Sequence, residues 1–195
     1  QPDRRQIPIE AVAVKGLRYP VTVRSRGENQ PTVAEFRMTV GLAATLKGTH
    51  MSRFVELLEA RAQSVDQDRF RAMVIDMLER LGAASGAIEM RFPYFIRKTA
   101  PVSGVESLID CDVAWRGSVS TGGAYAFRMQ LTAAGTSLCP CSKEISAYGA
   151  HNQRSHITID ADNVFTRVSS EELWACTTCK ACDEICPVNI EILDK

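Results

Sequence analysis

The sequence contains no apolar run long enough to cross a membrane and no excess of charge of either sign. A membrane-spanning helix needs about 18 apolar residues in succession, and no stretch approaches that length. Lysine plus arginine and aspartate plus glutamate number 23 each, so the formal net charge is zero. A neutral chain gives no electrostatic basis for binding nucleic acid or an acidic membrane surface. We therefore expect neither as a partner.

A secretory signal is also missing, which bears on how the cysteines are interpreted. Without such a signal we expect the reducing cytoplasm, where disulfides are rare. The chain has seven cysteines, an odd number, and six of them lie in two clusters. Clustered cysteines outside the secretory pathway are typical of metal or redox ligands. The seven are Cys111, Cys139, Cys141, Cys176, Cys179, Cys182 and Cys186.

Most of the chain has the composition and apolar periodicity of an ordinary globular domain. Hydrophobic residues make up 45% of the sequence and charged residues 24%, which is enough to form a core. Alternation on both sides of residues 27–31 predicts a β-hairpin with its turn there. Further alternation near residues 88–92, 109–115 and 125–131 predicts three more strands.

Two helices are predicted between the first hairpin and the later strands. Apolar residues at helical spacing begin after Ser52, a plausible N-cap. A clearer apolar stripe covers residues 70–81, and Gly82 is placed to end that helix. The order β-β-α-α-β-β(-β) predicts an α+β fold, an antiparallel sheet with two helices on one face. Open sheet edges predict a homo-oligomer. Cys111 falls on an apolar strand face and is expected to be a buried thiol without chemistry.

Residues 137–155 hold the densest group of candidate site residues. Cys139 and Cys141 straddle a proline, and His151 follows Cys141 after nine intervening residues. Thiolate and imidazole are the ligands that borderline-soft divalent metals prefer, and about three protein ligands suffice for a catalytic site. Ser142 is a possible N-cap, and Gly149 would let the backbone turn His151 back towards the cysteines. The alternative is a pair of buried thiols, although polar residues crowd this stretch, as expected of a cleft that holds a polar ligand.

The sequence of this stretch resembles the signature of GTP cyclohydrolase IB. It reads Ser-Leu-Cys-Pro-Cys-Ser-Lys-Glu-Ile-Ser, followed by Gly-Ala-His-Asn-Gln-Arg-Ser. Residues 47–54 (Lys-Gly-Thr-His-Met-Ser-Arg-Phe) and 98–104 (Lys-Thr-Ala-Pro-Val-Ser-Gly) resemble the same family, in the same order. The resemblance covers about residues 7–160. It implies a tunnelling fold, whose units associate into barrels through their sheet edges.

The resemblance also implies an activity and a set of site residues. The reaction would convert GTP and water to formate and 7,8-dihydroneopterin triphosphate, the first step of folate biosynthesis. Cys139 and His151 would be metal ligands, with Cys141 beside the metal as a second thiol. Zinc suits this pair, and a site completed by a carboxylate would also accept manganese or iron. The metal would lower the pKa of bound water towards about 7, and the resulting hydroxide would attack purine C8.

Three basic side chains near the ends of predicted elements are candidates for binding the triphosphate. His50 and Arg53 lie in one of the family-like stretches and Lys98 begins another. Loops at element ends are where binding groups usually gather. Solvated charge at a loop edge is an equally simple interpretation of each residue.

The chain departs from the family after about residue 160. The family's second half supplies one glutamate to the metal and another that anchors guanine, and neither has a matching motif here. Two ligands alone would hold a metal weakly. We therefore expect residues 1–167 to form a cyclohydrolase-like domain that lacks the second half of the family fold and needs a partner subunit to complete its site.

The last residues have a different composition and a different motif. From Val168 to Lys195 there are six acidic and two basic residues, a net charge of −4. The segment contains the run C-x2-C-x2-C-x3-C-P, which is typical of ferredoxins that bind a 4Fe-4S cluster. Its cysteines are Cys176, Cys179, Cys182 and Cys186. Such a run normally needs a second one, which the chain lacks, and four free cysteines are the alternative interpretation. We predict a separate iron–sulfur segment over residues 168–195.

Three functional hypotheses follow from these patterns. The first is a metal-dependent GTP cyclohydrolase acting through Cys139, Cys141 and His151. The second is an iron–sulfur electron carrier whose N-terminal domain is a scaffold. The third is a non-catalytic tunnelling-fold protein that binds a purine or pterin.

Overall fold

The computed structural model describes residues 8–25, 28–45, 48–99, 103–138, 144–145, 147 and 152–162. Six strands and two helices lie in these ranges, in the order ββααββββ. They are β1 (Ile9–Ser25), β2 (Glu28–Leu42), α1 (Ser52–Arg61), α2 (Gln67–Leu81), β3 (Gly86–Thr99), β4 (Glu106–Val119), β5 (Tyr125–Leu138) and β6 (Asn152–Asp162). Neither helix is long and apolar enough to cross a membrane.

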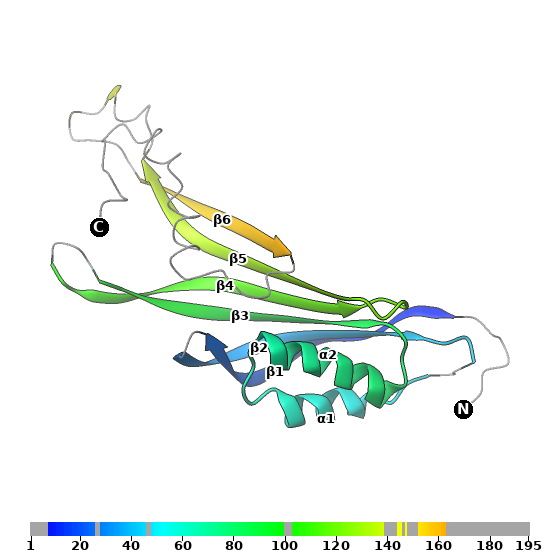
Figure 1. Cartoon of the computed structure of the whole chain (residues 1–195). Helices are drawn as coiled ribbons and strands as arrows, with labels where there is room; N and C mark the ends of the chain where they lie inside the picture. The colour runs from blue at the N-terminus through cyan, green and yellow to red at the C-terminus, as the bar shows by residue number, and fades with distance from the viewer. Residues whose placement is uncertain are drawn as a thin grey trace.

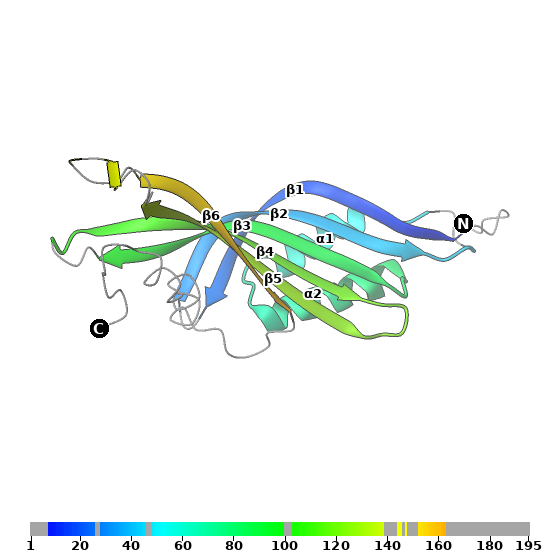
Figure 2. The same ribbon diagram turned by 90° about the horizontal axis from the view of Figure 1, so that it is seen from above.

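The strands form one antiparallel sheet in which sequence neighbours are also spatial neighbours. The order across the sheet is β1-β2-β3-β4-β5-β6, and every adjacent pair is antiparallel. Both helices pack on one face of this sheet (Figures 1 and 2). The predicted α+β architecture is therefore confirmed. Strand β6 was not predicted, although Ile157 and Ile159 alternate with polar residues within it.

The first hairpin is confirmed, but its turn is shorter than predicted. β2 begins at Glu28, so residues 28–31 belong to the strand rather than to the turn, and Pro31 pairs with Thr22 of β1. β2 pairs with β3 only from Glu35 onwards. Around Pro31 the strand therefore has a paired neighbour on one side only, which is where strands tolerate proline.

The two helices begin and end by different devices. The N-cap of α1 is Met51, with no side-chain capping bond, so the prediction of Ser52 was wrong. Met51 already has helical backbone angles and its carbonyl accepts from the Phe54 N–H at 3.2 Å, which places Ser52 inside the first turn. In α2, Asp66 caps the helix through a 2.8 Å bond from the Arg69 N–H. Gly82 ends α2 in the left-handed region at φ 60°, as predicted.

The hydrophobic core lies between the helices and the sheet. The apolar stripe of α2 is buried throughout, as its spacing predicted. Phe70 is fully buried and makes edge-to-face contacts with Trp115 of β4 and Phe127 of β5, at ring-centroid distances of 5.7 and 6.1 Å. Cys111 is only 4% exposed, so the prediction of a buried thiol is confirmed.

At one end the sheet divides into three two-stranded ribbons. β2–β3 pairing stops at Glu35 and Arg91, and β4–β5 pairing stops at Cys111 and Ala133. Within the ribbons, pairing continues to the ends of the β1–β2, β3–β4 and β5–β6 hairpins. Figure 1 shows β5 and β6 rising away from β4 there. We call this the forked end, and the opposite end, where β3 begins at Gly86, the closed end.

The aromatic contacts of Phe70 make it a test of the core. Phe70→Ala should lower the free energy of unfolding by about 3–5 kcal/mol, because it removes a fully buried ring and leaves a cavity. Ile75→Ala, on the exposed side of the same helix, should cost less than about 1 kcal/mol. Urea denaturation of both variants measures the difference. Equal losses would show that α2 does not pack as described.

Candidate functional site

His50 and Arg53 lie at the closed end, where α1 begins. The backbone carbonyl of His50 accepts a hydrogen bond from the Arg53 N–H at 3.2 Å. The Arg53 guanidinium donates to the backbone carbonyl of Arg80, in the last turn of α2. Both side chains are exposed. Arg53 thus supplies a donor to a helix C-terminus, where carbonyls lack intrahelical partners.

Lys98 lies at the forked end, opposite Ser107 near the end of the β3–β4 hairpin. β3 is 14 residues long, and at about 3.3 Å per residue its ends are roughly 40 Å apart. The structure therefore does not bring Lys98 together with His50 and Arg53 within one chain. Partial burial lowers the pKa of the Lys98 ammonium, against a smaller opposing effect of Cys111.

Cys111 lies on the helix-facing side of the same ribbon. Burial raises the pKa of its thiol, and the neighbouring carboxylates of Asp110 and Asp112 raise it further, while Lys98 acts in the opposite direction. A thiol whose pKa is raised stays protonated and is a poor nucleophile or metal ligand. This agrees with the expectation that Cys111 takes no part in chemistry.

Cys139, Cys141 and His151 lie outside the described residues, as do Ser142 and Gly149. The strands on either side of them are described. Leu138 of β5 pairs with Asn152 of β6 as the last couple of that ribbon at the forked end. Position 139 follows Leu138 and position 151 precedes Asn152, each by one peptide bond. The forked end therefore holds both Lys98 and the flanks of the predicted metal-ligating stretch.

The described residues do not themselves form a metal site. No three histidine, cysteine, aspartate or glutamate side chains gather among them. The four cysteines of the predicted iron–sulfur segment lie outside the described residues, so that prediction and the boundary at residue 168 stay predictions.

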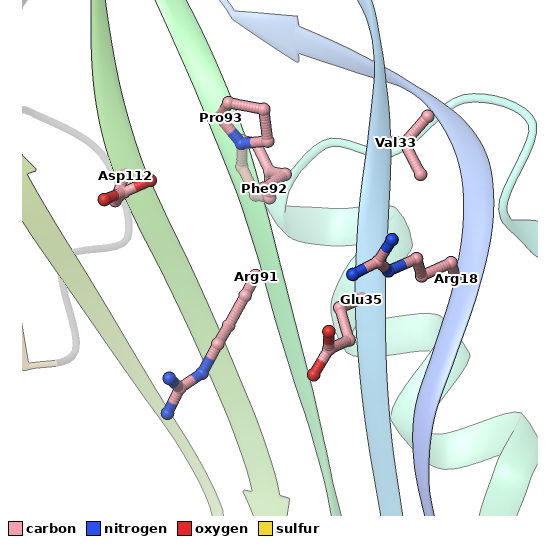
Figure 3. A pocket seen from close by; sticks show the side chains of 7 residues that line it. All are labelled: Arg18, Val33, Glu35, Arg91, Phe92, Pro93 and Asp112. Atoms are coloured by element: carbon pink, nitrogen blue, oxygen red, sulfur yellow. The ribbon is translucent and has the colours of Figure 1, made fainter.

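A groove of about 450 Å³ lies on the sheet face opposite the helices. Figure 3 shows its lining side chains in front of the translucent helices. Two arginines and two acids surround a small apolar patch; the lining residues are Arg18, Val33, Glu35, Arg91, Phe92, Pro93 and Asp112. The mixed charge disfavours a lone anion or cation as ligand.

The sequence analysis missed this groove because it depends on register. Arg18 pairs with Glu35, and Glu35 pairs with Arg91, so three strands place their charges side by side. Arg91 also forms an ion pair with Glu89 at 2.6 Å. Each charge alternates with apolar residues along its strand, which is the one signal the sequence carries. The lateral alignment of the strands is not visible in that alternation.

The comparisons with known proteins agree on one family. The family model described as type I GTP cyclohydrolase folE2 matches residues 1–188. The chain is 52% identical over 173 residues to GTP cyclohydrolase FolE2 of Azoarcus sp. (strain BH72), covering 88% of this chain and 62% of that protein. It is 56% identical over 161 residues to the protein of the same name from Cupriavidus necator, covering 83% of this chain and 60% of that protein. It is 55% identical over 184 residues to GTP cyclohydrolase FolE2 of Burkholderia ambifaria (strain MC40-6), covering 88% of this chain and 68% of that protein.

Two features of these matches bear on the predictions. The family match runs to residue 188, beyond the residue near 160 where the sequence resemblance ended, and so includes Cys176 to Cys186. The chain spans about three-fifths of the length of the first two relatives.

The lowered pKa of Lys98 predicts a pH-dependent stability difference. Between its folded-state pKa and its ordinary value of 10.5, the unfolded chain binds the Lys98 proton more often than the folded chain does. Stability then rises with pH. The free energy of unfolding of the wild type should therefore increase relative to that of Lys98→Met as the pH approaches 10.5. Urea denaturation at several pH values measures this, and the same change at exposed Lys15 controls for the loss of one positive charge. A wild-type advantage that falls with pH would contradict the burial of Lys98.

Proposed function

We propose, because this chain belongs to the type I GTP cyclohydrolase FolE2 family, that it forms part of an enzyme that hydrolyses GTP to formate and 7,8-dihydroneopterin triphosphate. The observation that carries the proposal is the match of the family model to residues 1–188. Relatives at 52–56% identity carry the same enzyme name. The reaction would be the first step of folate biosynthesis.

The forked end is the place where we put the active site. The pairing of Leu138 with Asn152 tethers Cys139 and His151 to adjacent strands, which supports a role for both side chains at one ion. In antiparallel strands, paired residues have Cα atoms about 4.5–5.5 Å apart. Cys141 would lie near the same ion as a second thiol. The proposal puts the reacting part of the nucleotide at the end of the β5–β6 ribbon.

A divalent metal held there would make bound water nucleophilic near neutral pH by lowering its pKa towards about 7. Zinc suits one thiolate and one imidazole, and a carboxylate as third ligand would admit manganese or iron. The family resemblance implies that this third ligand is a glutamate, for which the chain has no matching motif. It would come from the part of the protein that the relatives have beyond this chain, or from a partner subunit.

The positions of the basic residues support a shared site. Lys98 is at the forked end and could meet the phosphates of a nucleotide bound there. His50 and Arg53 are at the closed end of the same chain, so a neighbouring copy would have to supply them. Among the described strands, β1 and β6 each have a neighbour on one side only, and such open edges favour association. A tunnelling-fold homo-oligomer joined at these edges would bring groups from two chains together.

A 4Fe-4S cluster at Cys176, Cys179, Cys182 and Cys186 remains a secondary proposal. Its support is the motif alone, and family membership does not favour the electron-carrier hypothesis. Anaerobic purification and iron analysis test it directly. A colourless protein without iron after reconstitution would eliminate the cluster and leave the hydrolase proposal unchanged.

Formate release is the direct test of the hydrolase. The chain, supplied with zinc, manganese or ferrous iron under anaerobic conditions, should bind one divalent metal and release formate from GTP when its site is complete. Cys139→Ala and His151→Ala should each lose metal binding and reduce formate release by at least about 100-fold, because each removes a proposed ligand. Metal analysis and a formate assay measure the two effects.

Matched controls separate the site from general damage. His156→Ala removes an exposed histidine of β6, five positions after His151 in the sequence, and should leave metal binding and formate release unchanged. Formate release that survives His151→Ala would contradict the assignment. GTP binding without formate from any metal-loaded form, including one supplemented with a complete relative as partner subunit, would favour the non-catalytic binder instead.

A further inference from the structure

The backbone ladder between β2 and β3 is interrupted by a proline. In an antiparallel strand, alternate residues direct their N–H and C=O groups to the same neighbour. Phe95 directs its N–H to β2, where it donates to the Gln30 side chain. Pro93, two residues earlier, therefore also faces β2, and proline has no N–H to donate. Backbone pairing accordingly ends two residues before it, at Glu35 and Arg91.

Side chains of β2 replace the lost backbone bonds. The Thr32 hydroxyl donates to the Pro93 carbonyl at 3.0 Å. The Gln30 Nε2 group donates to the Phe95 carbonyl at 2.9 Å, and the Phe95 N–H donates to Gln30 Oε1 at 2.8 Å. A side-chain amide has the same donor and acceptor as a peptide group. Gln30 thus forms with Phe95 the reciprocal pair that two facing residues normally form in a sheet.

Beyond this point the β3–β4 ribbon has no backbone partner on either side among the described strands. We call residues 94–99 and 106–110 the β3–β4 arm. On its other side, pairing of β4 with β5 stops at Cys111 and Ala133. The arm carries Lys98 and exposes the side chains of Phe95 and Leu108. From β2, Gln30 makes two hydrogen bonds to the arm at Phe95.

We propose that Gln30 is a positioning residue, whose side-chain amide holds the β3–β4 arm against β2 and so sets the place of Lys98 at the forked end. The role of Lys98 in binding nucleotide phosphates rests on the proposed function, whereas the hold on the arm does not. Thr32 contributes a single bond at the base of the arm. Gln30 contributes two bonds farther out, where a small change of angle moves Lys98 most.

Hydrogen exchange of the arm tests the hold itself. Gln30→Met keeps the length of the side chain and removes its donor and acceptor. It should raise the exchange rate of the Phe95 amide about tenfold or more and raise that of other arm amides, while amides of α2 keep their rates. Gln130→Met is the matched control: the Gln130 amide bonds to Asp160 at 3.0 Å, but its strand has backbone partners on both sides. It should leave the arm unchanged. An unchanged arm in Gln30→Met, or equal increases across the whole sheet, would overturn the proposal.

A second variant tests the donor–acceptor pairing rather than the volume of the side chain. The carboxylate introduced by Gln30→Glu can accept from the Phe95 N–H but repels the Phe95 carbonyl. Below a pH of about 4 the carboxyl is mostly protonated and has one donor and one acceptor, as the amide does. Protection of the arm relative to wild type at the same pH should therefore be low at pH 7 and recover on acidification. A purely steric role for Gln30 predicts no such recovery and would contradict the proposal.

Nucleotide affinity tests whether the arm positions Lys98. The equilibrium dissociation constant for GTP, measured without added catalytic metal, should rise several-fold in Gln30→Met. It should not rise further when the same change is added to Lys98→Met, because the two residues act as one unit. If the losses of GTP affinity caused by Gln30→Met and Lys98→Met were additive in the double variant, the proposed link between Gln30 and Lys98 would be overturned. If the wild type binds no GTP, the proposed function and the link to Lys98 both fail, while the hydrogen-exchange result still decides whether Gln30 holds the arm.

Discussion

The register of the sheet is the constraint on which the rest of the structure depends. Side chains of a strand alternate between faces, so a slip of one residue would turn every buried side chain of that strand towards solvent. Phe36 pairs with Met90 and Met38 pairs with Ile88, and all four are fully buried beneath the helices. The apolar stripe of α2 closes over these positions. Once this register is fixed, each hairpin end, each charged pair and each interruption of the ladder has a determined place.

The register also explains why the candidate site gathers at one end of the molecule. Adjacent strands alternate in direction, so the β3–β4 and β5–β6 hairpins end on the same side of the sheet, away from the start of α1. Lys98 and the flanks of Cys139 and His151 therefore share the forked end, while His50 and Arg53 do not. That separation is consistent with a site assembled from more than one chain. The first two matched relatives also extend well beyond this chain.

Sequence patterns predicted what depends on periodicity and failed where lateral alignment or local geometry decides. The α2 stripe, the Gly82 terminus and the burial of Cys111 follow from spacing along a single element, and all three were confirmed. Ser52 has the residue type of an N-cap, yet the first turn begins one residue earlier at Met51. Pro31 resembles a turn residue, but the absence of a β3 partner there lets the strand continue. The groove lined by Arg18, Glu35 and Arg91 and the bond between Gln30 and Phe95 need the strand alignment, which no single segment encodes.

The forked end also separates what stabilises the protein from what shapes its working surface. In β3 the fully buried side chains, Ile88 and Met90, lie in the first part of the strand under the helices, whereas Phe95 and Leu108 of the arm are exposed. Substitutions in the ribbons can therefore accumulate without lowering the melting temperature much, while substitutions under the helices cannot. Among related sequences, the core under the helices should therefore change slowly and the ribbons faster. A ribbon could then adapt to a new ligand while the core stays the same.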